Sequence, residues 1–186
     1  MAFLIEIDKV KSIYRKSKTY SGEKYENDAE HSWHICMMAM VLAPHANEAI
    51  DLTKVIKMLL IHDIVEIDAG DTFLYAEHRE DVFEKEKLAA ERIFGLLPED
   101  QKNEFFELWL EFEEKKTSEA LFAGSIDRLQ PMLSNCLNQG TTWNEHGVKR
   151  QQVFDKNKVI DKGSKSLWEY AQDSLNQMVI QGILKD

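Results

Sequence analysis

The segment "LLIHDIVEIDAGDTF", residues 59–73, decides the fold expected of this chain. It begins as an apolar helix and then places His62 and Asp63 in the apolar run, with Glu66 one turn later. On a helical wheel of about 100° per residue, these three groups share a sector with Leu59 and point into the protein. Ionisable groups are costly to bury unless they are paired or bind a metal. The segment therefore predicts a buried charged centre.

A second histidine is expected in the core of the same structure. His31 opens a predicted helix over 29–43, and "NDAEH" offers Asn27 as its N-cap with Glu30 three residues later, a capping-box pattern. The apolar residues of this helix predict that it is a core element on the face formed by Trp33, Cys36, Met37, Met40 and Val41. His31 is therefore expected to be buried.

An aspartate far along the chain is expected to join these buried histidines and acids. Asp127 lies in "ALFAGSIDRLQPMLSN", residues 120–135, on the side of a predicted helix opposite to its large apolar residues. Two imidazoles and two carboxylates can hold one divalent cation and leave coordination positions open. We therefore predict a metal site at His31, His62, Asp63 and Asp127, for which Mn²⁺, Co²⁺, Fe²⁺, Ni²⁺, Zn²⁺ and Mg²⁺ all remain suitable. The alternative is a buried cluster of hydrogen-bonded polar groups without a metal.

Few prolines and glycines, and no lasting strand-like alternation, predict an all-α fold of about six to eight helices. The helices are expected at 3–16, 29–43, 51–66, 79–95, 99–114, 117–138, 149–156 and 165–182. Three segments are expected to be irregular, namely 17–28, 67–78 and 139–148.

Bulk composition narrows the class of protein. The 186 residues are 44% hydrophobic and 30% charged, which fits one globular domain over residues 1–186. The formal charge of −10, without a basic stripe, argues against binding to long nucleic acid. We expect no membrane segment and no signal peptide, because no apolar run approaches about 20 residues and the N-terminus carries early acids. Cys36 and Cys136 are expected to be buried thiols of a cytoplasmic protein.

The order of these motifs resembles a known family. His31, then His62–Asp63, then Asp127 in a helical chain is similar to the HD-domain superfamily of metal-dependent phosphohydrolases. The stretches "NDAEHSWH", "LIHDIVEIDAGDTF", "AAERIFGLLPED" and "SIDRLQPML" resemble its 5′-deoxynucleotidase branch. The resemblance implies an HD-domain helical bundle, one divalent metal, and a small phosphorylated substrate, with 5′-(deoxy)nucleoside monophosphates as the first expectation. It is compatible with a homodimer, although no stripe in the sequence specifies one.

The resemblance also assigns roles to three further residues. It implies that Glu66 is the catalytic acid or base, that Arg15 binds the phosphate, and that Asp71 contacts the sugar. Alternatively, Glu66 orients a metal ligand, Arg15 is a solvated surface residue, and Asp71 caps the turn after Gly70. The chain departs from the deoxynucleotidases by having Lys16 directly after the arginine and Thr72–Phe73 after the Gly–Asp pair.

Two side chains near the irregular segment 67–78 are weaker candidates for contact with a substrate, namely His78 and Arg79. His146 is a candidate to cover a pocket, and Arg128, which follows Asp127, is a candidate to pair with a nearby carboxylate. His34 is expected to be a core or surface histidine. Two other functions stay open at this point. One is a nucleotide-sensing module that binds metal without turnover, and the other is a hydrolase of a phosphodiester or triphosphate bond.

Overall fold

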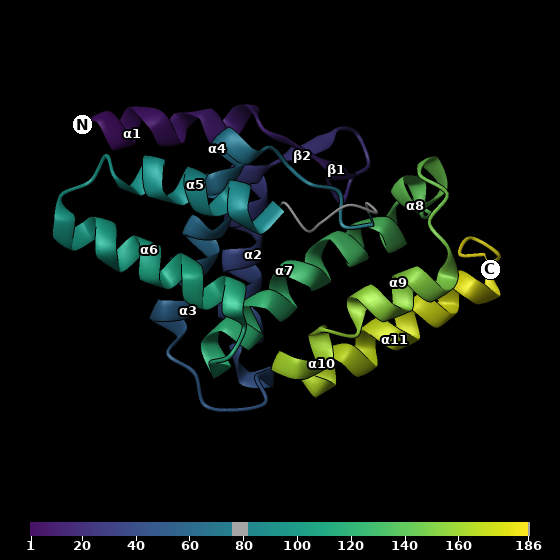
Figure 1. The fold of residues 1–186 in the computed structure, drawn as a ribbon. Helices are drawn as coiled ribbons and strands as arrows, with labels where there is room; N and C mark the ends of the chain where they lie inside the picture. Colours follow the sequence, from purple (N-terminus) through teal and green to yellow (C-terminus); the bar gives the residue numbers. More distant parts are fainter. Residues whose placement is uncertain (76–81, 186) are drawn as a thin grey trace.

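Most of the chain is helical in the computed structural model, which describes residues 1–75 and 82–185 (Figure 1). The helices are α1 (Ala2–Glu6), α2 (Asp28–Leu42), α3 (Leu52–Ile61), α4 (Glu66–Ala69), α5 (Val82–Phe94), α6 (Glu99–Glu114), α7 (Ser118–Leu137), α8 (Thr141–Glu145), α9 (Arg150–Asn157), α10 (Ile160–Gly163) and α11 (Lys165–Ile180). Short 3-10 helices cover Ile7–Ser12, Ala43–His45 and His62–Val65, and β1 (Tyr14–Lys18) pairs with β2 (Tyr25–Asn27). The predicted helical fold class is confirmed, with a small sheet in addition.

Side-chain caps determine where the long helices begin. The predicted capping box is present at α2, where Asn27 accepts a hydrogen bond from the Glu30 N–H at 3.0 Å and donates its own N–H to Glu30 at 3.3 Å. Asp51 caps α3 and Thr117 caps α7 through a side-chain oxygen that accepts a backbone N–H, without the reciprocal bond. Each cap satisfies a backbone N–H that has no partner within its helix. The start of α2 is thereby fixed, and with it the position of His31.

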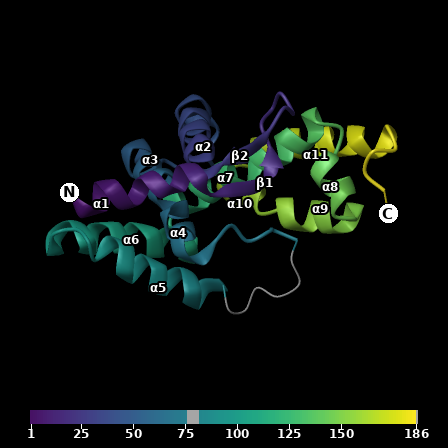
Figure 2. The ribbon, with the colours of Figure 1, turned by 90° about the horizontal axis from the view of Figure 1, so that it is seen from above.

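The core forms around α7, which contacts α2, α3, α6, α10 and α11. Phe122, Ile126 and Leu129 on α7 are fully buried, as their spacing predicted. In Figure 1, α7 runs diagonally through the middle of the molecule, and Figure 2 shows α2 and α5 at opposite edges of it. One long helix thus reaches both the core and the candidate site.

The prediction for the buried face of α2 is correct at Cys36 and wrong at its other four residues. Trp33, Met37, Met40 and Val41 are exposed, whereas the buried face is His31, Ile35, Cys36 and Ala39. The physical reason is that apolar residues occur all around this helix, so a helical wheel does not distinguish its inner side from its outer side. The prediction that His31 is buried is correct.

The predicted helix over 3–16 was also wrong in its second half. The backbone leaves the helical region at Ile13, which is extended (φ −90°, ψ 119°), and residues 14–18 form β1. Tyr14 pairs with Asn27 and Lys18 pairs with Tyr25, so β2 occupies part of the segment expected to be a loop. Pairing with a strand overrides the local helical preference.

The helix predicted over 51–66 is interrupted at the His–Asp pair. α3 ends at Ile61, a 3-10 turn spans His62–Val65, and α4 begins at Glu66. In a 3-10 turn, residues three apart lie above one another, so Asp63 and Glu66 face the same way. Because of this interruption, the two carboxylates point in more similar directions than they would on a regular helix.

Smaller departures occur towards the C-terminus. The segment 139–148, expected to be irregular, contains α8, and α10 was not predicted at all. The expected site residues His78 and Arg79 lie outside the described residues. Within the described ranges, no helix is both long enough and apolar enough to cross a bilayer. Both cysteines are free, and Cys36 is buried while Cys136 is half-buried.

Candidate metal centre and substrate cavity

Four predicted ligands from three segments lie together in the interior. His31 comes from α2, His62 and Asp63 come from the 3-10 turn after α3, and Asp127 comes from α7. The Nε2 atom of His31 is 3.2 Å from Asp127 Oδ1 and 4.0 Å from Asp63 Oδ2. The Nε2 atom of His62 is 3.1 Å from Asp63 Oδ1 and 3.6 Å from Asp127 Oδ1. Ligand atoms of His31, His62 and Asp63 all lie within 4.8 Å of one another.

The other ring nitrogen of each histidine is held by an acceptor. Nδ1 of His62 lies 3.0 Å from the Leu59 carbonyl oxygen, which can only accept, so Nδ1 is the donor. Nδ1 of His31 lies 3.2 Å from Oε1 of Gln130 and 3.4 Å from the carboxylate of Glu26. Both imidazoles therefore direct Nε2 at the cluster, which is the orientation that metal-binding histidines adopt.

Negative charge from the carboxylates predominates at the buried centre. His62 Nε2 is buried and has no hydrogen-bond partner among the residues that the structure describes. Burial lowers the pKa of His62, but Asp63 and Asp127 outweigh that effect and raise it to about 10. The two carboxylates thus favour a cation at this position. Two nitrogens and two carboxylates match the donor set of a divalent cation, so the residues fit such an ion.

A second group of acids adjoins the first. Oxygens of Asp28, Asp63 and Glu66 lie within 4.8 Å of one another, and all three side chains are buried or nearly so. Burial, together with Asp63, raises the pKa of Asp28 to about 7 and raises the pKa of Glu66 well above its usual value. Oε2 of Glu66 has no partner within the described part of the chain. Sequence reasoning missed Asp28, although its position one turn before His31 was a usable signal.

Arg15 reaches the centre from β1, not from a helix as expected. Its Nη1 atom donates to Asp63 and lies 3.4 Å from Asp28 Oδ1. The side chain is 14% exposed. The alternative of a solvated surface arginine is therefore wrong, and the guanidinium lies beside the predicted ligands.

Asp71 and Asp68 take different positions. Asp71 follows Gly70, whose φ of 76° turns the chain after α4. The Asp71 side chain lines a cavity beside the His–Asp cluster. Burial raises the pKa of Asp71, and its Oδ2 is unpartnered in the described ranges. Asp68 instead forms an ion pair with Arg92 on α5, at 2.8 Å in one of its two hydrogen bonds. Asp71 is thus the acid that a substrate could meet.

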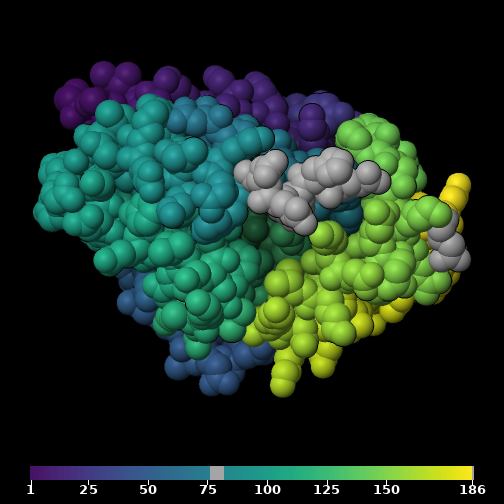
Figure 3. Space-filling view, in the orientation of Figure 1, coloured from purple at the N-terminus to yellow at the C-terminus, as the bar shows by residue number. Residues whose placement is uncertain are grey.

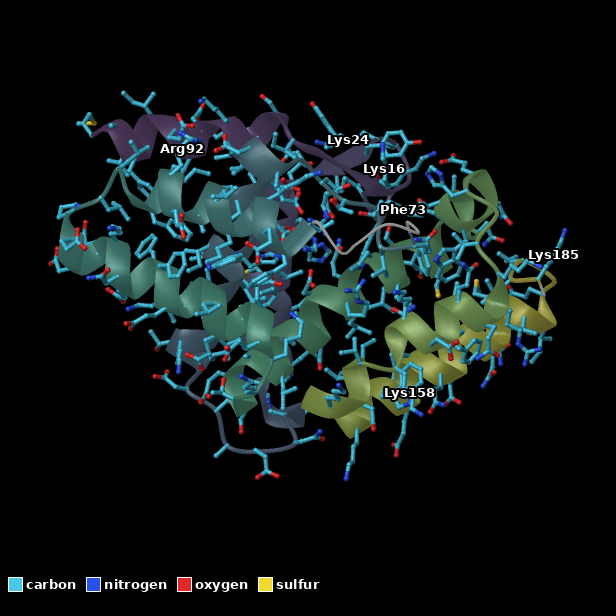
Figure 4. All side chains as sticks on the ribbon, viewed as in Figure 1. Lys16, Lys24, Phe73, Arg92, Lys158 and Lys185 are labelled. Atoms are coloured by element: carbon cyan, nitrogen blue, oxygen red, sulfur yellow. The ribbon has the colours of Figure 1, made fainter. Side chains whose placement is uncertain are left out.

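A cavity of about 280 Å³ opens beside the centre. Its lining includes the cations Arg15, Lys16, Lys115 and Arg128, the acids Asp63, Glu66, Asp71, Glu113 and Asp127, and the aromatic residues Phe73, Tyr75, Phe112 and Trp143. Figure 3 shows the surface hollowed between α6 and α9, with α7 visible at the floor. In Figure 4, Lys16 and Phe73 lie at the β1 end of this region, far from Arg92 and Lys158.

Of the other residues singled out in the sequence, some lie at the cavity and one does not. Arg128 lines the cavity. His146 packs against the ring of Phe73, with ring centroids 4.5 Å apart. His34 does not line this cavity and instead makes an edge-to-face contact with the Tyr20 ring. Sequence reasoning missed Glu26, Gln130 and Lys115, because only the tertiary structure brings them to the site.

The helical fold thus gathers two histidines and two aspartates, a donor set that fits a divalent cation, beside a cavity lined by both cations and acids. A family model of the HD domain matches residues 7–168, and the chain belongs to this family. The expected membership of the HD-domain superfamily is thereby confirmed.

Comparisons with known proteins agree with this family. The 5′-deoxynucleotidase HDDC2 of Mus musculus is 30% identical over 136 residues, which cover 72% of this chain and 66% of that protein. The Dictyostelium discoideum protein of the same name is 30% identical over 158 residues, covering 79% and 82%. The chain spans slightly less than two thirds of the mouse protein's length.

A solved structure resembles the whole chain. It is described as a predicted metal-dependent phosphohydrolase from Magnetospirillum magnetotacticum MS-1, with 49% identity and a TM-score of 0.96. The match covers 100% of this chain and 94% of that one. A conserved hypothetical protein from Pyrococcus furiosus, 19% identical with a TM-score of 0.63, shares the fold.

Proposed function

We propose that this phosphohydrolase removes phosphate from 5′-deoxynucleoside monophosphates and releases a nucleoside and inorganic phosphate. One observation carries the proposal: Glu66, Arg15 and Asp71 line the same cavity as the His–Asp cluster. The names of the relatives from Mus musculus and Dictyostelium discoideum support the choice of substrate.

We infer that His31, His62, Asp63 and Asp127 hold one divalent cation. When bound, such a cation draws charge from a phosphoryl oxygen and makes an attacking water more acidic. The protein's contribution is to keep both imidazoles oriented through Leu59 and Gln130, so that their Nε2 lone pairs face the ion.

Arg15 would neutralise the remaining charge of the phosphate. A guanidinium offers several N–H donors in a planar fork, which matches phosphate oxygens. Within the described residues, Arg15 donates from Nη1 to Asp63 and Asp28, and these hydrogen bonds hold the group against the cluster. Its other donors are then available for an anion in the cavity.

Glu66 would move the proton. Water attacks phosphorus, the new P–O bond forms, and the bond from phosphorus to the 5′ oxygen breaks. The water loses a proton and the leaving 5′ oxygen gains one, and a carboxyl group within reach of both can carry it. The buried and unpartnered Oε2 of Glu66 lies beside Asp63 in the cavity wall, which suits this role.

The sugar and base would occupy the β1 side of the cavity. The unpartnered Oδ2 of Asp71 can accept a hydrogen bond from a 3′-hydroxyl. The rings of Phe73 and Tyr75 line the same space, with centroids 5.3 Å apart, and offer apolar surface to a base.

We also propose that residues 1–186 form one HD domain. Support comes from α7, which contacts helices from both halves of the chain, and from the family match over residues 7–168. The cavity draws on β1, α6 and α7 together, so the site needs all of these elements.

The test is a phosphate-release assay on a panel of 2′-deoxynucleoside and ribonucleoside 5′-monophosphates in Mn²⁺, Co²⁺ and Mg²⁺, with a chelator as control. Asp63→Asn, which removes one proposed ligand charge, serves as the inactive reference. We expect metal-dependent release from the deoxynucleotides that falls to the Asp63→Asn level in chelator.

Other outcomes would select the remaining alternatives. Binding of nucleotides without release would favour a sensing module. Release only from nucleoside triphosphates or from phosphodiesters would favour a hydrolase of another bond. Equal release by native protein and Asp63→Asn would reject the proposed chemistry.

A further inference from the structure

Lys115 has an unusual backbone for a lysine. It follows the last residue of α6 and lies in the left-handed region, with φ 49° and ψ 48°. This conformation is costly for residues with a Cβ and is usually left to glycine. Its N–H makes the last hydrogen bond of the helix, to the Glu111 carbonyl oxygen at 3.2 Å, and the left-handed backbone then ends α6. A glycine would end α6 at a lower backbone free-energy cost, so the lysine at this position is explained by what its side chain contacts.

The side chain enters the cavity instead of the solvent. Its ammonium donates to the Phe112 carbonyl oxygen at 3.2 Å and lies 3.8 Å from the centroid of the Phe112 ring. Its stem crosses Gly124 on α7, where an added Cβ would lie 3.3 Å from Cε of Lys115. The absence of a side chain at Gly124 thus leaves the space that the lysine occupies.

Within the described part of the chain, the Lys115 ammonium has no ion pair, although the protein is strongly acidic. No carboxylate of the described residues lies within 4.0 Å of its Nζ, although Glu113 and Asp127 line the same cavity. By contrast, the next residue, Lys116, is exposed and pairs with Glu114 at 3.1 Å. Lys115 is therefore a cation held by a carbonyl and a ring, with donors left over for a ligand.

The position is close to the metal centre. The ring of Phe112, on which the ammonium lies, also packs against the His62 imidazole, with centroids 4.9 Å apart. Arg15 approaches the centre from β1, whereas Lys115 approaches from the end of α6. An anion between them would meet a cation from each of two elements.

We propose that Lys115 is a second cationic contact for the phosphate group of the substrate. The inference rests on the proposed function for its substrate and deepens it. The reason is the balance of charge: a phosphate monoester brings two negative charges into a cavity already lined by carboxylates, and a charge-assisted hydrogen bond from Lys115 offsets that repulsion.

The experiment measures binding of inorganic phosphate to the Mn²⁺-loaded protein by calorimetry. Lys115→Gly and Lys115→Asn remove the charge, and both residues tolerate the left-handed backbone. We expect phosphate binding to weaken about 10-fold or more, because a charge-assisted hydrogen bond is lost. Binding of Mn²⁺ alone should not change, since Lys115 is not among the proposed ligands. Lys115→Arg, which keeps the charge, should restore part of the affinity.

Two further variants test whether the effect is specific to Lys115. Lys116→Asn is the matched control and should bind phosphate as native protein does. Gly124→Val places bulk against the lysine stem while leaving Lys115 in the sequence, and should also weaken phosphate binding. It decides the matter if the position-115 variants do not fold.

Native affinity for phosphate in Lys115→Gly and Lys115→Asn would overturn the proposal, as would an Mn²⁺-loaded native protein that does not bind phosphate. These measurements need no turnover. Failure of the nucleotide panel would reject the substrate, whereas failure here would reject only the contact from Lys115.

Discussion

The imidazole of His31 is tied to Gln130, whose Oε1 lies 3.2 Å from His31 Nδ1. The Gln130 amide in turn donates to the carboxylate of Glu26 at 2.9 Å, and that carboxylate also lies 3.4 Å from His31 Nδ1. All three side chains are buried. A residue of β2 and a residue of α7 thus fix the orientation of a proposed ligand on α2.

This arrangement predicts that Gln130→Leu weakens metal binding without removing a ligand. The substitution removes one of the two acceptors at His31 Nδ1 and the donor to Glu26, so the ring is held by Glu26 alone and less firmly. We expect the affinity for Mn²⁺ to fall about 10- to 100-fold, the usual effect of losing such a partner. Calorimetric titration with Mn²⁺ measures it. An exposed change on the same helix, Leu137→Gln, is the control, and equal affinities for the two variants would contradict the prediction.

The donor cluster also predicts that divalent cations stabilise the fold. Asp63 Oδ1 and Asp127 Oδ1 lie 3.1 Å and 3.6 Å from the same atom, His62 Nε2. A ligand that binds these groups only in the native state adds to the free energy of unfolding. At a Mn²⁺ concentration of about 100 times its Kd, the gain is about 2.7 kcal/mol. Thermal unfolding with Mn²⁺ and then with a chelator measures it. Asp127→Asn should lose most of the increase in Tm, and an equal increase in that variant would place the ion elsewhere.

Glu66→Gln should separate binding from catalysis. The amide fills the same space but cannot carry the proton, so kcat should fall about 10²- to 10⁴-fold. Affinity for Mn²⁺ should be kept, because the four proposed ligands remain. Asp68→Asn is the matched control, since Asp68 is an acid on the same helix that pairs with Arg92 outside the cavity. A Glu66→Gln enzyme with native kcat would show that another group moves the proton.

The sequence predicted those parts of the site that follow from local pattern. His62, Asp63 and Glu66 share the buried side of an apolar segment, and helical periodicity is enough to show it. The capping box at Asn27 likewise depends on neighbouring residues alone. His31 and Asp127 could be added because each lies on a helix of clear apolar character.

The rest depends on contacts between segments that are distant in sequence. Arg15 was expected on a helix, yet β1 forms because it pairs with β2, and no local pattern specifies that pairing. Glu26 and Gln130 are ordinary polar residues until the fold places them behind His31. Lys115 lies in a run of charged residues, in which no local pattern shows the left-handed backbone that it adopts at the end of α6.

The two cysteines should be unreactive in the native protein. Burial raises the pKa of the Cys36 thiol and of the Cys136 thiol to about 11 each. The thiolate is the reactive form, so at pH 8 only about one thiol in a thousand is ionised. We expect slow labelling by Ellman's reagent at pH 8 that becomes complete in denaturant. Rapid labelling of the native protein at pH 8 would show that the thiols are more accessible than in this structure.

The contact between α10 and α7 predicts a severe steric effect at Gly163. A Cβ at this position would lie 2.3 Å from the Leu121 carbonyl oxygen and 2.4 Å from Ser125 Oγ. Both atoms belong to α7, the helix that carries Asp127, so neither can move without shifting the core. Gly163→Ala should therefore lower the free energy of unfolding by about 1–3 kcal/mol, as overpacking does. Urea unfolding measures this loss. Gly147→Ala is the control, because an added Cβ there meets nothing within 4 Å and only the left-handed backbone (φ 61°) opposes it. A smaller loss for Gly163→Ala than for Gly147→Ala would show that α10 can move away from α7.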